Sequence, residues 1–118
     1  MDNKYHNENY SFRFVNLPPK ETIKFREISN DWKPRIKKYK NLENFVITFQ
    51  IAPNTSYHSL INFIKENKIE RALYGFFISL ETNSDMDGVH VPDYILDLYK
   101  KVGGNIDFSF IFINEEDE

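Results

Sequence analysis

Four stretches of the chain carry an apolar side chain at every second position, and this alternation limits what the chain can fold into. They are residues 10–16, 45–51, 72–80 and 106–113. A period of two is the pattern of a β-strand with one buried face, so we predict four strands. In residues 72–80 both faces are partly apolar, which favours a central place in the sheet for that strand.

Two segments between these strands change to helical spacing. The first has possible capping residues at 54–56, ends near Asn67, and carries an apolar stripe formed by Tyr57, Leu60, Ile61 and Ile64. The second begins at Pro92, a residue that suits the first turn of a helix, and stops at Gly103. Residues 45–113 therefore predict a strand–helix–strand–helix–strand run with two crossover connections.

These elements predict an α+β fold in a single domain over residues 1–118. Each helix has one apolar stripe and each strand has one dense face, so the economical packing is a two-layer α/β sandwich. We expect a four- to five-stranded mixed sheet with two helices on one face. Residues 22–28 fit either a short helix or a second strand carrying Ile23 and Phe25, and we favour a short strand or an irregular arm over residues 20–31. Residues 1–9 and 115–118 are expected to be disordered tails.

The face of the sheet opposite the helices should be open and mostly polar. Period-two alternation places seven residues there: Arg13, Thr48, Gln50, Phe77, Ser79, Asp107 and Ser109. A small-ligand-binding or regulatory module could use this face, with Arg13, Gln50, Phe77 and Asp107 as its contact residues. A hollow with convergent polar groups would favour that hypothesis.

The sequence gives no pattern typical of an enzyme, a metal site or a cofactor site. It has no cysteine, which excludes thiolate chemistry and suits a cytoplasmic protein. His6, His58 and His90 lack the spacing that places two imidazoles on one helix face. The segment at 85–90 has two aspartates and a glycine but lacks the remaining ligands of a calcium loop. We expect no catalysis, no metal, no cofactor, no signal peptide and no membrane segment.

Charge divides unevenly along the chain. Residues 20–41 hold eight Lys/Arg and three Asp/Glu, a local net of +5, whereas residues 79–118 hold ten Asp/Glu and two Lys, a net of −8. The basic segment 32–40 mixes cations with aromatics, a composition that can grip single-stranded nucleic acid. The net charge of −3 and a single ring on the open face argue against nucleic acid as a partner.

The acidic third predicts a basic protein partner. The candidate contact residues lie in the loop and helix before the last strand: Glu81, Asp85, Asp87, His90, Asp93 and Asp97. Like charges four apart on a helix cost some stability, so a field for a basic partner is one rationale for Asp93 and Asp97. Dipole stabilisation at a helix N-terminus is the alternative for Asp93.

A resemblance points the same way. The segment Gly88–Asp93, the following helix, and the segment Gly103–Phe110 resemble small bacterial α/β proteins of the immunity type from polymorphic-toxin and contact-dependent-inhibition loci. The resemblance covers residues 45–113. It implies a non-catalytic cytoplasmic protein that binds a cognate toxin domain and occludes its active site.

Overall fold

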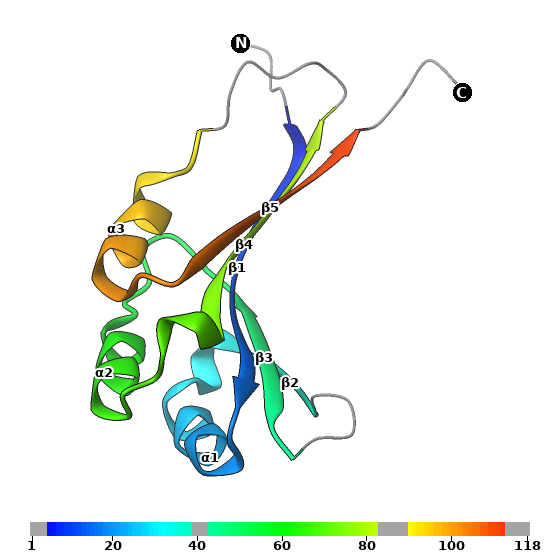
Figure 1. The fold of residues 1–118 in the computed structure, drawn as a ribbon. Helices are drawn as coiled ribbons and strands as arrows, with labels where there is room; N and C mark the ends of the chain where they lie inside the picture. The colour runs from blue at the N-terminus through cyan, green and yellow to red at the C-terminus, as the bar shows by residue number, and fades with distance from the viewer. Residues whose placement is uncertain (1–4, 39–42, 83–89, 113–118) are drawn as a thin grey trace.

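A computed structural model describes residues 5–38, 43–82 and 90–112, without the side chains of 5–7, 82, 111 and 112. Its sheet has five strands in the order β2-β3-β1-β4-β5. All neighbours pair antiparallel except β4 and β5, which are parallel. The predicted mixed sheet of an α+β protein is therefore confirmed (Figure 1). The strands are β1 (Tyr5–Leu17), β2 (Arg35–Lys38), β3 (Phe45–Gln50), β4 (Tyr74–Thr82) and β5 (Asn105–Phe112).

The α-helices form one layer on one side of the sheet (Figure 1). They are α1 (Pro19–Ile28), α2 (His58–Glu66) and α3 (Asp93–Val102), and short 3-10 turns, η1 and η2, occupy Asn30–Trp32 and Arg71–Leu73. Each helix lies in a connection between two strands that run in the same direction. The two-layer packing agrees with the prediction, with α1 as an additional member of the helix layer.

Aromatic rings fill the space between the two layers. Phe12 of the central strand is fully buried, and its ring lies 5.2–5.6 Å from the rings of Phe14, Phe49, Tyr74 and Phe76. Rings at these separations add to the stabilisation that comes from burying their area. Alternation along β1 thus places one face in the core and leaves the other free for a site.

The expectation of a strand or an irregular arm over residues 20–31 is wrong, because α1 covers Pro19–Ile28. A strand would place Ile23 and Phe25 on one face, but Ile23 is 62% exposed and Phe25 is fully buried. Pro19 is at the first helical turn, where its missing N–H costs nothing. Phe25 then packs against Phe14, Trp32, Phe49 and Phe63.

The expectation of a disordered tail over residues 1–9 is also wrong for its second half. Residues 5–9 belong to β1 and pair with the end of β4, from Ser79 to Thr82. Their polar side chains do not indicate a strand, because backbone hydrogen bonds between strands do not require apolar side chains. The other predicted tail, 115–118, lies outside the described residues.

Two glycines turn the chain from α3 into β5. Gly103 and Gly104 have φ angles of 71° and 96°, which glycine adopts without a Cβ penalty. The hydroxyl of Tyr74 donates a hydrogen bond to the carbonyl oxygen of Val102 just before this turn. The predicted helix stop at Gly103 is confirmed, and the turn brings β5 alongside β4.

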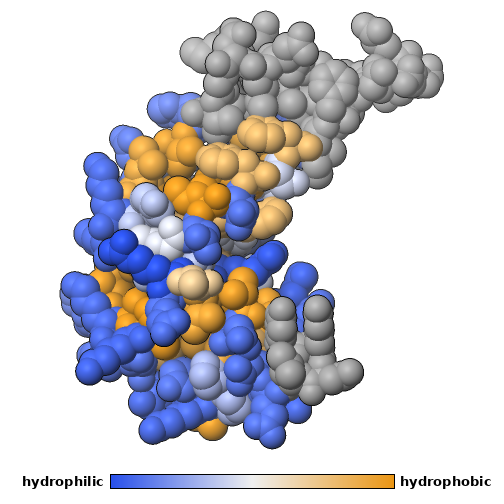
Figure 2. Space-filling model, viewed as in Figure 1, coloured by the Kyte–Doolittle hydropathy of each residue, from blue (hydrophilic) through white to orange (hydrophobic). Residues whose placement is uncertain are grey.

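The helix layer leaves part of β5 uncovered. Figure 2 shows hydrophobic side chains gathered where α3 and β5 meet. Phe108 and Phe110 are 45% and 48% exposed, and their rings stack with centroids 6.1 Å apart. The inner face of the sheet is thus well covered over β1, β3 and β4 and less so over β5.

Candidate functional site

The register of the sheet places the predicted polar residues together on its open face. Arg13 of β1 lies opposite Thr48 of β3 on one side and Gly75 of β4 on the other. Ser11 lies opposite Gln50 and Phe77 in the same way. Their neighbours on β1, Phe12 and Phe14, are buried under the helices. The predicted alternation of this face is therefore correct.

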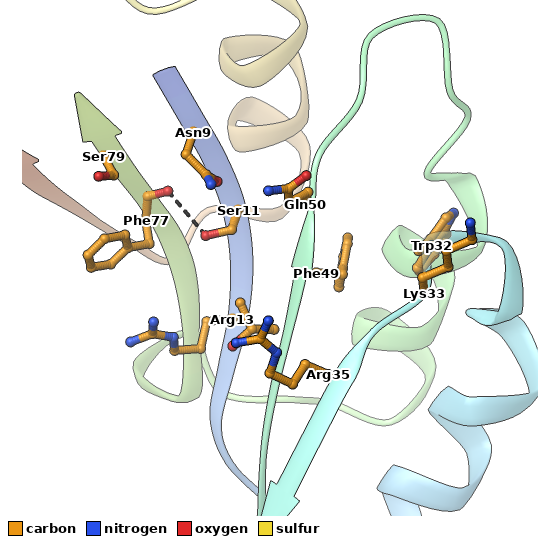
Figure 3. Close-up of a pocket in the computed structure, with 11 residues that line it drawn as sticks. Asn9, Ser11, Arg13, Trp32, Lys33, Arg35, Phe49, Gln50, Phe77 and Ser79 are labelled. Atoms are coloured by element: carbon orange, nitrogen blue, oxygen red, sulfur yellow. Dashed lines mark hydrogen bonds between the residues drawn. The ribbon is translucent and has the colours of Figure 1, made fainter. Parts of the chain in front are cut away.

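A groove of about 490 Å³ runs over this face (Figure 3). We call it the basic groove, because three of its eleven lining residues are cations and none is a carboxylate. It continues past the start of β2 toward η1. Its lining consists of Asn9, Ser11, Arg13, Trp32, Lys33, Arg35, Thr48, Phe49, Gln50, Phe77 and Ser79.

Arg13 lies in the floor of the groove with part of its hydrogen-bonding capacity unused. Its Cζ lies 5.0 Å from the centroid of the Phe77 ring, a cation–π arrangement. Its Nε is buried and has no hydrogen-bond partner among the described residues. Most buried polar atoms in proteins are paired, so this nitrogen is a donor that the described part of the fold leaves unsatisfied. Ser11 Oγ nearby donates to the carbonyl oxygen of Phe77 at 3.3 Å.

A second arginine, Arg35, lies on the other side of β3 from Arg13. Thr48 pairs with Arg13 on one side and with Arg35 on the other, so the three residues form one row across three strands. The backbones of the two arginines are two strands apart, about 9.6 Å, and both side chains line the groove. Lys37 follows two positions after Arg35 and borders a smaller hollow with Arg13, Arg35 and Thr48.

Packing of Trp32 holds the lysine at the end of the groove. The Trp32 ring lies 5.0 Å from that of Phe49 and 5.1 Å from that of Tyr57. Lys33, the next residue, ends η1 with a left-handed backbone (φ 51°, ψ 56°), and its N–H donates to the carbonyl oxygen of Asn30 at 3.3 Å. Lys33 lines the groove next to Trp32.

All four residues predicted for the ligand face are brought together by the fold. Arg13, Gln50 and Phe77 line the basic groove. Asp107 pairs with Phe77 from β5 and borders a neighbouring hollow that also includes Arg13 and Phe77. Asp107 therefore flanks the groove without lining it.

Two residues of the groove, Lys33 and Arg35, are not among those that the sequence predicts for the open face. The sequence of residues 32–40 indicates a basic segment, whereas Arg35–Lys38 is a strand of the sheet. The missed signal was the apolar Ile36 between two cations, since Ile36 packs against the core while Arg35 and Lys37 are exposed. That is the alternation of a short edge strand.

The residues predicted to contact a basic partner divide between two faces. Glu81 alternates with the buried Leu80 and so lies on the open side of β4. His90, Asp93 and Asp97 are exposed near or on α3, in the helix layer. Asp85 and Asp87 lie outside the described residues. The described members thus do not form one continuous surface.

No match to this chain is found among protein-family models, curated proteins or solved structures. Within the described ranges, no His, Cys, Asp and Glu side chains group in a way that could hold a metal ion. None of the helices in those ranges has the length and apolar character needed to span a bilayer.

Proposed function

We propose that this chain is a non-catalytic binding protein that holds an anionic ligand in the basic groove. The observation that carries the proposal is the convergence of Arg13, Lys33 and Arg35 on one concave surface whose described lining has no carboxylate. Cations held together without acidic partners repel one another, and an anion relieves this repulsion. The unpaired Nε of Arg13 adds a donor that the folded chain does not satisfy.

The geometry suits a carboxylate or phosphate group. A guanidinium offers parallel N–H donors that match the oxygens of such groups, and the resulting hydrogen bonds are short and strong. Arg13 and Arg35 flank Thr48 in one row across the strands, and the Thr48 hydroxyl can donate a further bond. Rings of Trp32 and Phe77 line the groove, and low-polarity walls strengthen the attraction between opposite charges.

The lining supports binding rather than proton transfer. General acid–base catalysis at neutral pH uses groups such as imidazoles and carboxylates, with pKa values near the operating pH. The described groove residues are cations, amides, hydroxyls and aromatic rings. They can position and neutralise an anion, and this favours a binding role.

The proposal is tested by calorimetric titration with citrate and inorganic phosphate. Arg35→Gln removes one guanidinium at an exposed site, and Arg26→Gln on the exposed surface of α1 is the matched control. Loss of a charge-assisted hydrogen bond costs about 1.5–3 kcal/mol, which corresponds to binding about tenfold to a hundredfold weaker. The control should bind within about twofold of the original chain, because its charge lies outside the groove. Absence of binding at millimolar anion, or equal effects of the two variants, would contradict the proposal.

A second candidate is the cytoplasmic immunity-type protein that the sequence suggests, with the acidic part of α3 as its surface. The observation that favours it is the exposure of both Asp93 and Asp97, which are four positions apart on the helix. Co-purification with the C-terminal domain of a toxin encoded beside this chain is the test. A complex that the double variant Asp93→Asn, Asp97→Asn weakens would support it, and no complex at micromolar concentration would reject it.

A further inference from the structure

The strand that carries Arg35, one of the three cations of the groove, is also an edge of the sheet. β2 pairs with β3 on one side, and no described strand lies on its other side. An edge strand presents backbone N–H and C=O groups that a further strand can pair with. Arg35, Lys37 and Lys38 are all exposed, so their side chains leave that edge accessible.

The cations beside this edge follow the repeat of an extended chain. Arg35 and Lys37 alternate with the partly buried Ile36 and lie on the open face beside Arg13. Lys33 lines the basic groove at its far end but lies outside this repeat, because its backbone is left-handed and β2 begins at Arg35. In a strand, side chains on one face recur every two residues, about 6.6 Å apart. An extended peptide with acidic residues at alternate positions has the same spacing.

We propose that the ligand is an extended acidic peptide that pairs with the free edge of β2 and sets alternate carboxylates against Arg35 and Lys37. This inference rests on the proposed function, since it uses Arg35 of the basic groove. Addition of a strand to a sheet edge is a common mode of peptide recognition, in which the backbone supplies affinity and alternate side chains supply specificity. Opposite charges facing each other across a strand pair stabilise it.

The charge of β2 also excludes other strands, including a second copy of itself. Pairing two copies of β2 would set basic side chains against basic side chains, which is destabilising. Lysines and a proline at an edge are devices that keep sheets from pairing with any available strand, and here Pro34 precedes Arg35. An acidic strand is the partner that these side chains accept.

Fluorescence anisotropy with a labelled six-residue peptide of alternating Glu and Val tests the inference. One comparison peptide has the same composition with its three Glu residues grouped, and another has alternate amides N-methylated. The grouped peptide no longer places a carboxylate at every second position, and the N-methylated peptide lacks backbone N–H donors. Each should bind about fivefold or more weakly than the alternating peptide. Lys37→Glu should weaken it about tenfold, whereas Lys38→Glu should change it about twofold at most, because Lys38 belongs to the other face of β2.

The outcomes separate this inference from the proposed function. If the grouped and the N-methylated peptides bind as tightly as the alternating peptide, and citrate still binds, strand pairing is overturned and the anion site is retained. Tighter binding of an oligothymidylate than of the alternating peptide would overturn it in favour of a single nucleic-acid strand. Failure of citrate, phosphate and all peptides to bind would overturn both.

Discussion

Arg13→Met should make the folded chain more stable while weakening anion binding. Arg13 Nε is buried without a hydrogen-bond partner among the described residues. A buried donor left unsatisfied costs about 1–3 kcal/mol. Methionine removes this donor and keeps an unbranched stem that can pack against the Phe77 ring. The substitution also removes the cation–π contact with Phe77, which contributes about 0.5–1 kcal/mol to stability at a partly exposed site.

The difference predicts a gain of about 1 kcal/mol in the free energy of unfolding. Urea denaturation measures this free energy. Its dependence on urea concentration should stay unchanged, because the same surface is exposed on unfolding. Arg26→Met, at an exposed site on α1, serves as the control and should stay within about 0.5 kcal/mol. Citrate binding by Arg13→Met should fall about tenfold or more, because a charge-assisted bond is lost.

Two results would refute this reasoning. A loss of stability greater than about 1 kcal/mol would mean that the guanidinium supports the sheet through its other nitrogens, and Arg13 would then be a structural residue. Unchanged citrate affinity would mean that Arg13 takes no part in the site. A gain in stability together with a loss of binding is the pattern expected where a site holds unsatisfied polar groups for a ligand.

Three further predictions concern the fold. Gly75→Ala should lower the free energy of unfolding by about 1–3 kcal/mol in urea, because a Cβ there would lie 2.5 Å from the Asn105 carbonyl oxygen of β5; an unchanged midpoint would contradict the β4–β5 register. Phe25→Ala should lower the free energy of unfolding by about 3–5 kcal/mol, since this ring of α1 is fully buried. A loss below about 1 kcal/mol would mean that α1 does not pack against the core through Phe25. Burial raises the pKa of Tyr74 in the folded chain. Its contribution to stability is therefore complete below about pH 10, where the unfolded group titrates, and is lost as the pH rises above that value. Tyr74→Phe lacks the hydroxyl that binds the Val102 carbonyl oxygen, so it should remove the Tyr74 contribution to the loss of stability at high pH. Denaturation measured across this pH range checks it, and an unaltered dependence on pH would contradict the role given to Tyr74.

The parts of the fold that the sequence predicted are those in which apolar period and burial agree. Phe12 and Phe14 alternate on a strand that is central, so the pattern in the sequence and the packing coincide. α1 was missed because its stripe is short: Thr22 and Phe25 are its buried residues, and the exposed Ile23 suggested a strand face. Packing of Phe25 against four other elements (β1, η1, β3 and α2) determines the structure of that segment, and no local sequence pattern indicates such contacts.

The site was predicted in part for the same reason. Arg13, Gln50 and Phe77 follow from alternation within strands that are plainly apolar on the other face. Arg35 could not be assigned to the same face without knowing that β2 pairs with β3, a contact between segments joined by residues 39–44. The groove lies where β2 begins and Trp32 packs on Phe49, and that arrangement appears only in three dimensions.

The most direct test of an anion site on the open face is a ¹H–¹⁵N NMR titration of the whole chain with citrate. We predict that the largest shift changes fall on the backbone amides of Ser11, Arg13, Arg35 and Gln50, and that added salt reduces them because exposed charges are screened. Changes confined to α3 around Asp93 and Asp97, or no changes at millimolar citrate, would contradict the proposal.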